Sequence, residues 1–254
     1  MSALVAAAGD LSVVSMDFLA AQQGGTLLQT LTLYLFFAGT VAMGAGALYF
    51  FLLRGDVDQE YRSTMVVAGL VCAIACFHYL KMTSVYQAGG GFPTALRYVD
   101  WLFTTPLLLV KFPLLLRLGE RGTKFFWQLV VLDVAMIVTA FIAETSPVDS
   151  QPWWTFFLIS CGFELAIVGV LFVSLGQAIA DAPAPLAKAL ETMRLFVLIG
   201  WAIYPIGFLM ARAGAGEYRE IIYNVADVIN KVGFGLVAYQ GIKAMSHRGH
   251  AATT

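Results

Sequence analysis

The chain has 254 residues, of which 59% are hydrophobic and 12% are charged. Soluble domains carry about 25% charged residues, so this composition excludes an ordinary soluble fold and favours a membrane protein. The formal net charge is -1 and no basic run occurs, which excludes a nucleic-acid partner. The cysteines, Cys72, Cys76 and Cys161, lack metal-ligand spacing, so we expect core residues and no metal site.

Seven apolar stretches are long enough to cross a bilayer, which takes about 20 mainly apolar residues per helix. They cover residues 26–53, 63–80, 92–116, 125–143, 152–175, 195–211 and 221–242. Short connections make neighbouring helices antiparallel. We therefore predict an all-α membrane protein, a seven-transmembrane-helix bundle without a separate soluble domain.

Lys and Arg are unevenly shared between the two sides of this bundle. Cytoplasmic loops carry the excess of positive charge, which places the C-terminus in the cytoplasm and the N-terminus outside. The inner cations are then Arg54, Arg62, Arg117, Arg121, Lys124, Lys188, Arg194, Lys243 and Arg248, and the outer ones are Lys81, Arg212 and Arg219. The predicted parts are an extracellular N-terminal tail (1–25), the bundle (26–246) and a cytoplasmic tail (247–254).

Charged residues also occur inside the predicted spans. They are the cations Arg97, Lys111 and Lys231 and the acids Asp100, Asp133, Glu164 and Asp227. A charge at mid-bilayer costs roughly 3 kcal/mol on insertion scales, so such residues face the interior and usually mark a pathway. A structural ion pair or a side chain reaching the surface is the alternative for any single one of them.

The third span carries its polar residues on one face. At about 100° per residue, Arg97, Asp100, Thr104, Leu108 and Lys111 fall within an arc of roughly 80°. A rise of about 1.5 Å per residue puts Lys111 roughly 16 Å from Asp100 toward the cytoplasm. This spacing predicts a polar ladder through the membrane.

In the last span, Asp227 and Lys231 are four residues apart and share a face. A lone lysine in an apolar helix favours a covalent role, because desolvation disfavours its charged form and leaves an amine that can condense with an aldehyde. The resulting buried cation needs anions, and Asp100 and Asp227 are available.

Three motifs carry a family resemblance. Residues 97–106 (RYVDWLFTTP), 201–205 (WAIYP) and 222–231 (IYNVADVINK) resemble the microbial rhodopsins, and among them the proteorhodopsins. The resemblance implies that Lys231 binds all-trans-retinal as a Schiff base and that Asp100 is counterion and first proton acceptor. Asp227 would complete the counterion, with Arg97 on its outer side and Thr104 hydrogen-bonded to Asp100.

The same resemblance implies a retinal pocket in which Trp101 and Trp201 sandwich the polyene. Its other residues would be Thr105, Leu108, Met136, Ser160, Tyr204, Pro205 and Phe208. Taken alone, each aromatic residue fits ordinary core packing, and the joint pattern favours a pocket. Leucine at position 108 accompanies green rather than blue absorption in the proteorhodopsins.

Three further positions take a role from the resemblance. His78 would contact the acceptor carboxylate and tune it through charge coupling. Asp133 would hydrogen-bond Thr105 and support structure rather than transport. Phe157 fills the place of a glycine in antenna-binding relatives, so no carotenoid antenna is expected.

Lys111 departs from the family pattern, because most pumping relatives have a carboxylic acid eleven residues after the acceptor. A minority carry lysine there. Either Lys111 takes a cytoplasmic proton and passes it to the Lys231 nitrogen, or it snorkels to the inner surface and anchors the helix. Glu164 lies near the ring end of retinal or faces a neighbouring subunit, and Glu217 and Glu220 are expected to form a solvated rim.

The leading prediction is a light-driven outward proton pump, not an enzyme, in the inner cell membrane. Its partners would be protons, lipid and identical subunits in a pentamer or hexamer formed through the first two helices, near Phe37, Arg54 and His78. The runner-up is a photosensor that signals through a separate partner, and a third possibility is a retinal-free transporter. Sodium and chloride pumps replace the acceptor or its threonine, so the triplet Asp100, Thr104 and Lys111 disfavours them.

Overall fold

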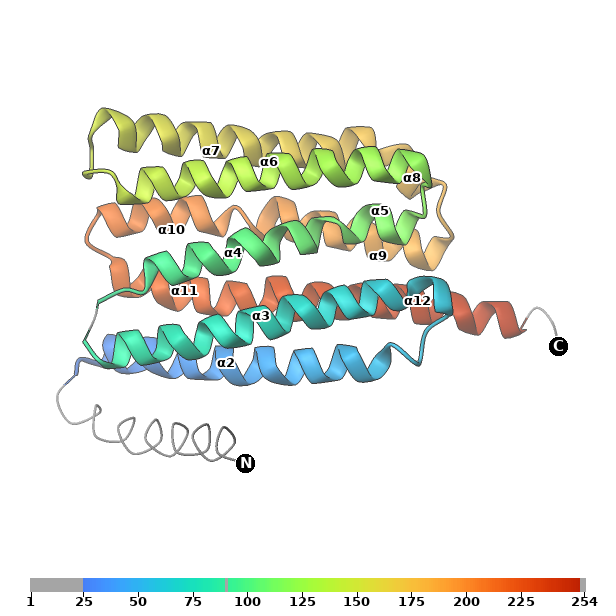
Figure 1. Cartoon of the computed structure of the whole chain (residues 1–254), viewed down its shortest axis with the longest axis horizontal. Coiled ribbons are helices and arrows are strands. Elements are labelled where there is room, and N and C mark those ends of the chain that lie inside the picture. Colours follow the sequence, from blue (N-terminus) through green and yellow to red (C-terminus); the bar gives the residue numbers. More distant parts are fainter. Residues whose placement is uncertain (1–24, 90, 252–254) are drawn as a thin grey trace, which may run out of the picture.

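The structure is a computed structural model that describes residues 25–89 and 91–251. Its described part contains seven helical spans that are long and apolar enough to cross a membrane (Figure 1). The spans are Leu27–Leu53, Gln59–Gln87, Thr94–Leu116, Glu120–Thr145, Gln151–Ser174, Ala184–Arg212 and Gly216–Met245. The predicted seven-helix bundle is confirmed. The predicted outer tail, apart from Gly25, and residues 252–254 of the predicted inner tail lie outside the described residues.

Most spans contain more than one helical element. The first four consist of α2 (Leu27–Leu53), η2 (Gln59–Tyr61) with α3 (Arg62–Gln87), α4 (Thr94–Leu109) with α5 (Lys111–Leu116), and α6 (Glu120–Thr145). The last three consist of α7 (Gln151–Gly169) with η3 (Val170–Ser174), α9 (Ala184–Leu195) with η4 (Phe196–Gly200) and α10 (Ile203–Arg212), and α11 (Gly216–Val228) with η5 (Ile229–Gly233) and α12 (Phe234–Ala251). The short α8 (Gly176–Ala180) joins the fifth span to the sixth, and η3, η4 and η5 are π-helical turns.

Local sequence explains where several of these helices begin and end. Thr26 and Gln29 form a reciprocal capping box at the start of α2, which satisfies two free backbone amides. The side chain of Ser150 accepts a hydrogen bond from the Trp153 amide and so caps α7. Pro113 lacks an amide hydrogen, and the chain changes from α4 to α5 one turn earlier, at Val110.

The sixth span begins eleven residues before the predicted position 195, because α9 is amphipathic rather than uniformly apolar. One of its faces is buried, with Leu186, Ala189, Leu190 and Met193 inside the bundle. Lys188 and Arg194 therefore lie on this helix, and their assignment to an inner loop was wrong. The second span likewise extends to Gln87, so that Lys81 lies within α3.

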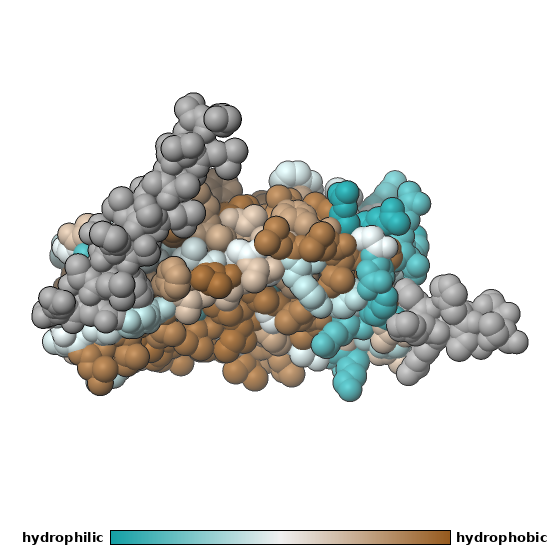
Figure 2. All heavy atoms as spheres, turned by 90° about the horizontal axis from the view of Figure 1, so that it is seen from below, coloured by the Kyte–Doolittle hydropathy of each residue, from teal (hydrophilic) through white to brown (hydrophobic). Residues whose placement is uncertain are grey.

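The spans form a closed bundle with an apolar exterior. α2 packs against both α3 and α11, α6 packs against α7, and α9 packs against α12. Large apolar side chains cover the outside, and Leu52 and Val173 are each 80% exposed. Figure 2 shows apolar residues along the sides and hydrophilic ones gathered at one end. An apolar exterior of this kind is typical of a protein surrounded by lipid.

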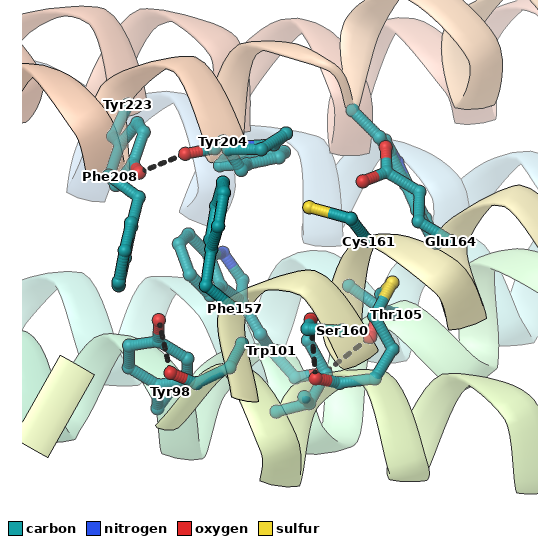
Figure 3. Close-up of a pocket in the computed structure, with 15 residues that line it drawn as sticks. Tyr98, Trp101, Thr105, Phe157, Ser160, Cys161, Glu164, Tyr204, Phe208 and Tyr223 are labelled. Atoms are coloured by element: carbon teal, nitrogen blue, oxygen red, sulfur yellow. Dashed lines mark hydrogen bonds between the residues drawn. The ribbon is translucent and has the colours of Figure 1, made fainter. Parts of the chain in front are cut away.

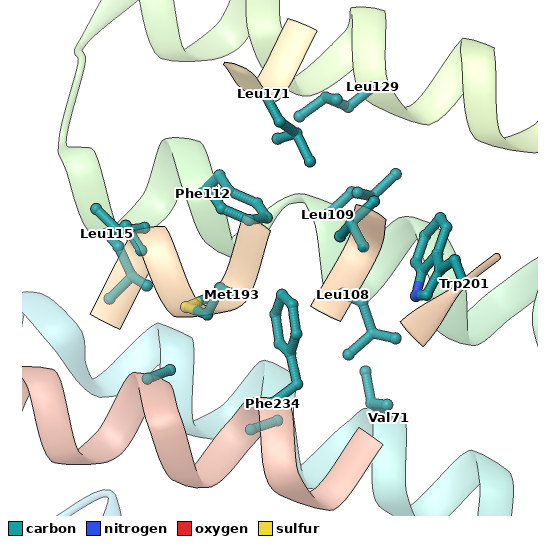
Figure 4. Packing of buried hydrophobic residues seen from close by; sticks show 14 of the residues in the cluster. Val71, Leu108, Leu109, Phe112, Leu115, Leu129, Leu171, Met193, Trp201 and Phe234 are labelled. Carbon is teal, nitrogen blue, oxygen red and sulfur yellow. The ribbon is translucent and has the colours of Figure 1, made fainter. Parts of the chain in front are cut away.

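Buried apolar side chains fill one half of the bundle's length. Figure 4 shows Leu109, Phe112, Leu129, Leu171, Met193 and Phe234 packed together between the spans. All six are almost completely buried. The half of the bundle that contains α5, α9 and α12 is therefore closed by hydrocarbon.

Candidate functional site

Lys231 lies between two carboxylates in the middle of the bundle. Its Nζ is 3.1 Å from Oδ2 of Asp100 and 3.0 Å from Oδ2 of Asp227, and all three side chains are buried. Asp100 comes from α4, and Lys231 stands in the π-helical turn η5, one turn after Asp227. That turn is tied to the sixth span, because Nδ2 of Asn230 donates to the carbonyl of Gly200 in η4 at 3.0 Å.

The two carboxylates have different surroundings. Asp227 accepts hydrogen bonds from the Tyr79 hydroxyl at 2.9 Å, the Tyr204 hydroxyl at 2.6 Å and Nε1 of Trp101 at 3.2 Å. Apart from the shared Lys231 ammonium, neither oxygen of Asp100 has a hydrogen-bond donor within the described part of the chain. The two carboxylates therefore differ in how many donors hold them, and a carboxylate held by fewer donors is freer to accept a proton.

The contacts of Thr104 and His78 with Asp100 differ in part from those predicted from the sequence. The Thr104 hydroxyl donates to the backbone carbonyl of Asp100 at 2.9 Å, within its own helix, and not to the carboxylate. Nδ1 of His78 lies 2.9 Å from the carbonyl of Ile74, which can only accept, so this nitrogen carries a hydrogen. It also lies 3.6 Å from Oδ1 of Asp100, a distance that couples the two groups electrostatically without a hydrogen bond.

A chain of buried charges continues from Asp227 toward the end of the bundle at which α11 begins. Arg97 lies 3.5 Å from Asp227, pairs with Glu220 at 2.6 Å and donates to Asn224 at 2.9 Å. Arg219 contacts the other oxygen of Glu220 at 3.0 Å. Its second partner is Glu144 of α6, at 2.7 Å.

This network corrects the prediction for the outer residues. Glu220 is 1% exposed and Arg219 is 5% exposed, so neither belongs to a solvated rim or an outer loop. Glu217 is half-buried and accepts hydrogen bonds from Thr32 and Tyr86. The seventh span starts at Gly216, five residues before the predicted start, which brings these residues into the helix.

Replacing Glu220 with glutamine is expected to destabilise the protein by about 3–5 kcal/mol, because two buried guanidinium groups lose their shared carboxylate. The matched control is Asp149→Asn, which breaks the exposed pair with Arg212 and should cost far less stability, because solvent screens this pair. Thermal unfolding of both variants in detergent measures the difference. Equal stability of the two variants would show that the buried pairs of Glu220 with Arg97 and Arg219 do not hold the spans together.

Lys111 lies inside the bundle and not at its surface. Its side chain is 0% exposed, and within the described residues its Nζ has no hydrogen-bond partner. The ammonium group lies 5.1 Å from the ring centroid of Phe234, within the range of a cation–π contact. A snorkelling lysine would place its nitrogen at the membrane surface, so the snorkelling alternative is wrong.

Asp133 links the third span to the fourth. The Thr105 hydroxyl donates to Oδ2 of Asp133 at 2.7 Å and also to the backbone carbonyl of Trp101 at 2.8 Å. Asp133 is fully buried in α6. This position suits a structural bond between two helices.

A cavity lined mainly by apolar and aromatic side chains opens beside these groups (Figure 3). Eight residues that the sequence analysis placed at the retinal pocket line this cavity: Trp101, Thr105, Met136, Ser160, Trp201, Tyr204, Pro205 and Phe208. The sequence did not predict Tyr98, Ile137, Ala140, Phe157, Cys161 and Tyr223 as lining residues. Glu164, expected either near the ring end of retinal or at a neighbouring subunit, lines the cavity. Leu108 is buried in the main apolar cluster and does not line the cavity.

The residues present fit retinal. Trp101 and Tyr204 both line the cavity and donate to Asp227, so the cavity adjoins the carboxylate that holds Lys231. A long apolar polyene suits the aromatic walls, and the amine of Lys231 suits an aldehyde at one end of it. Lys231 does not itself line the cavity, and the link runs through these two aromatic residues.

Comparison with known sequences gives the same assignment. Residues 30–245 match the family model described as bacteriorhodopsin-like protein. The green-light absorbing proteorhodopsin of Gamma-proteobacterium EBAC31A08 is 32% identical over 234 residues, which cover 90% of this chain and 93% of that protein.

Solved structures agree with this match. The crystal structure of Exiguobacterium sibiricum rhodopsin is 46% identical, with a TM-score of 0.79, and the match covers 85% of this chain and 98% of that one. Xanthorhodopsin, described as a light-driven ion pump with dual chromophore, is 29% identical, with a TM-score of 0.81 and coverage of 88% and 96%. The chain therefore belongs to the bacteriorhodopsin-like family of retinal-binding rhodopsins, and it is a multi-pass protein of the cell membrane.

Proposed function

We propose that this rhodopsin is a light-driven pump that moves protons outward, with retinal on Lys231 and with Asp100 as the first proton acceptor. The observation that carries the proposal is the contrast between the two carboxylates at the Lys231 nitrogen. Besides the Lys231 nitrogen that both share, Asp227 is held by three donors, whereas Asp100 has none among the described residues. The proteorhodopsin and xanthorhodopsin relatives support a rhodopsin of the light-driven proton-pump kind.

When bound, retinal supplies a light-driven isomerisation that changes how strongly the nitrogen on Lys231 holds its proton. Asp100 lies 3.1 Å from that nitrogen and takes the proton. Asp227 keeps its charge and its position because Tyr79, Trp101 and Tyr204 hold it.

The direction of proton transport and the orientation of the chain follow from what lies on each side of Lys231. The buried ion pairs through Arg97 and Glu220 continue to one end, and the apolar cluster around Lys111 closes the other. We assign the end with the ion pairs to the outside, because the exposed cations Arg54, Arg117 and Lys124 belong to the opposite end. The N-terminus is then outside and the C-terminus is cytoplasmic.

Illumination of unbuffered cells that express the protein with retinal tests this function. A pump acidifies the medium, and an uncoupler abolishes the change. A flat trace, with a normal visible band, would instead favour a photosensor that acts through a separate partner.

Replacing Lys111 with alanine is expected to slow return of a proton to the Lys231 nitrogen by at least about tenfold, since general acid–base groups contribute about 10²–10⁴ in rate. Lys111 is the buried cation on the inner side, and no acid is paired with its nitrogen in the described structure. Flash photolysis measures the rate. Lys124→Ala, at an exposed lysine of α6, is the matched control, and an unchanged rate in Lys111→Ala removes Lys111 from the path.

We also propose a homo-oligomer, a pentamer or hexamer, formed through the first two spans. The face of α2 that points away from the bundle exposes apolar side chains that include Leu48 and Leu52. Cross-linking in membranes tests the oligomer.

We also propose that the protein binds no carotenoid antenna. Phe157 stacks on Phe208 with ring centroids 4.8 Å apart and fills the wall of the cavity.

A further inference from the structure

The wall of the retinal cavity that α7 provides is partly polar. Ser160, Cys161 and Glu164 lie along one side of this helix and line the cavity (Figure 3). The Ser160 hydroxyl is already used, since it donates to the carbonyl of Met136 at 2.9 Å. The Glu164 carboxyl makes neither a hydrogen bond nor an ion pair with any described residue. The proton path proposed above does not use it.

Glu164 belongs to the wall that is remote from Lys231. Lys231 and its carboxylates lie among α4, η5 and α11, where Trp101 and Tyr204 border the cavity. α7 packs instead against α6, on the other side of the third span. Figure 1 shows α6 and α7 along one edge of the bundle, separated from α11 and α12 by α4 and α10.

The chemistry of retinal sets which end of the molecule meets this wall. The aldehyde and the ring are at opposite ends of the polyene, so a retinal that reacts with Lys231 directs its ring away from η5, toward α7. The ring of unsubstituted retinal is pure hydrocarbon. It leaves a carboxyl in that wall without a partner, and an unpaired polar group in an apolar cavity is unfavourable.

We propose that Glu164 is a specificity-determining residue that accepts a hydrogen bond from a ring hydroxyl, so that the cavity takes ring-hydroxylated retinal in preference to unsubstituted retinal. The inference rests on the proposed function, because it takes retinal as the occupant. A carboxyl accepts such a bond whether or not it carries a proton, so the preference does not depend on the charge of Glu164. A site that offers a hydrogen bond to a ligand hydroxyl discriminates against the ligand that lacks it.

The test measures retinoid binding without covalent attachment. In the Lys231→Ala background, all-trans-retinal and its 3-hydroxy derivative are titrated separately, and quenching of tryptophan fluorescence reports occupancy, since Trp101 and Trp201 line the cavity. The measured quantity is the ratio of the two Kd values in each variant. This ratio cancels differences in detergent partition that are common to all variants.

We expect the preference for the hydroxylated retinoid to fall about tenfold in Glu164→Leu, as expected for loss of one hydrogen bond to a carboxyl, and to persist in Glu164→Gln, whose amide still accepts. Glu191→Leu, at an exposed glutamate of α9, is the matched control and should leave the ratio unchanged. The same ratio in Glu164→Leu and in the parent would overturn the inference while leaving the proposed function intact. Failure of both retinoids to form a visible band with the chain that keeps Lys231 and Glu164 would overturn both. Formation of the visible band with Lys231 restored shows that each variant folds.

Discussion

Replacing Lys231 with alanine is expected to abolish the visible absorption band that forms when all-trans-retinal is added to the purified protein. The Lys231 amine is held by Asp227, whose donors Trp101 and Tyr204 line the cavity, and the carboxylates at 3.0 and 3.1 Å stabilise a positive charge on this nitrogen. Without this nitrogen the aldehyde has no partner at that place. Absorption spectra before and after addition of hydroxylamine, which bleaches a retinal bound in this way, measure the effect.

Lys188→Ala is the control for this experiment, since that lysine is exposed on α9 and should leave the band unchanged. The informative contrary result is a band in Lys231→Ala that hydroxylamine still bleaches. It would mean that another amine reacts, and Lys111 would be the first to examine, because it is also fully buried.

Replacing Asp100 with asparagine is expected to reduce light-driven acidification to the level seen with an uncoupler, while the pigment still forms. Asparagine keeps the shape of the side chain and cannot take a proton. Asp227 cannot substitute for it, because three donors already bind its carboxylate. Measurement of pH in illuminated, unbuffered cell suspensions checks the result.

Asp181→Asn is the matched control, since this carboxylate is exposed and lies far along the chain from the site. It should pump as the parent does. Pumping by Asp100→Asn at the parent rate would mean that a different group receives the proton, and Asp227 would then be the candidate.

Helix periodicity explains why much of this site was predictable. Residues three, four and seven apart on one helix share a face whatever the neighbouring helices do. The ladder from Arg97 to Lys111 and the pair Asp227 and Lys231 are arrangements of this kind, and all four of these residues are buried. The resemblance to the rhodopsins added the partners across helices, which periodicity cannot supply.

Contacts between spans depend on packing and were predicted less well. The predicted solvated rim at Glu220 is wrong, since Glu220 stands four residues before Asn224 and seven before Asp227, on their buried face of the helix. This spacing was a usable signal. The Thr104 hydroxyl donates to a backbone carbonyl and not to the carboxylate of Asp100, and Leu108 packs in the apolar cluster and not in the cavity wall. Side-chain rotamer and helix tilt decide such contacts, and helix periodicity does not give them.

The π-helical turn that carries Lys231 makes room for one extra residue in the seventh span. A π turn holds one residue more than an α turn in about the same rotation, so the helix on either side of η5 keeps its facing. In a regular α-helix, by contrast, deletion of one residue rotates the rest of the helix by about 100°. A deletion in α12 before Lys243 would therefore turn Lys243 away from Asp56, with which it now forms an ion pair of 2.6 Å, whereas exchanges of side chains at the lipid face leave this pair in place.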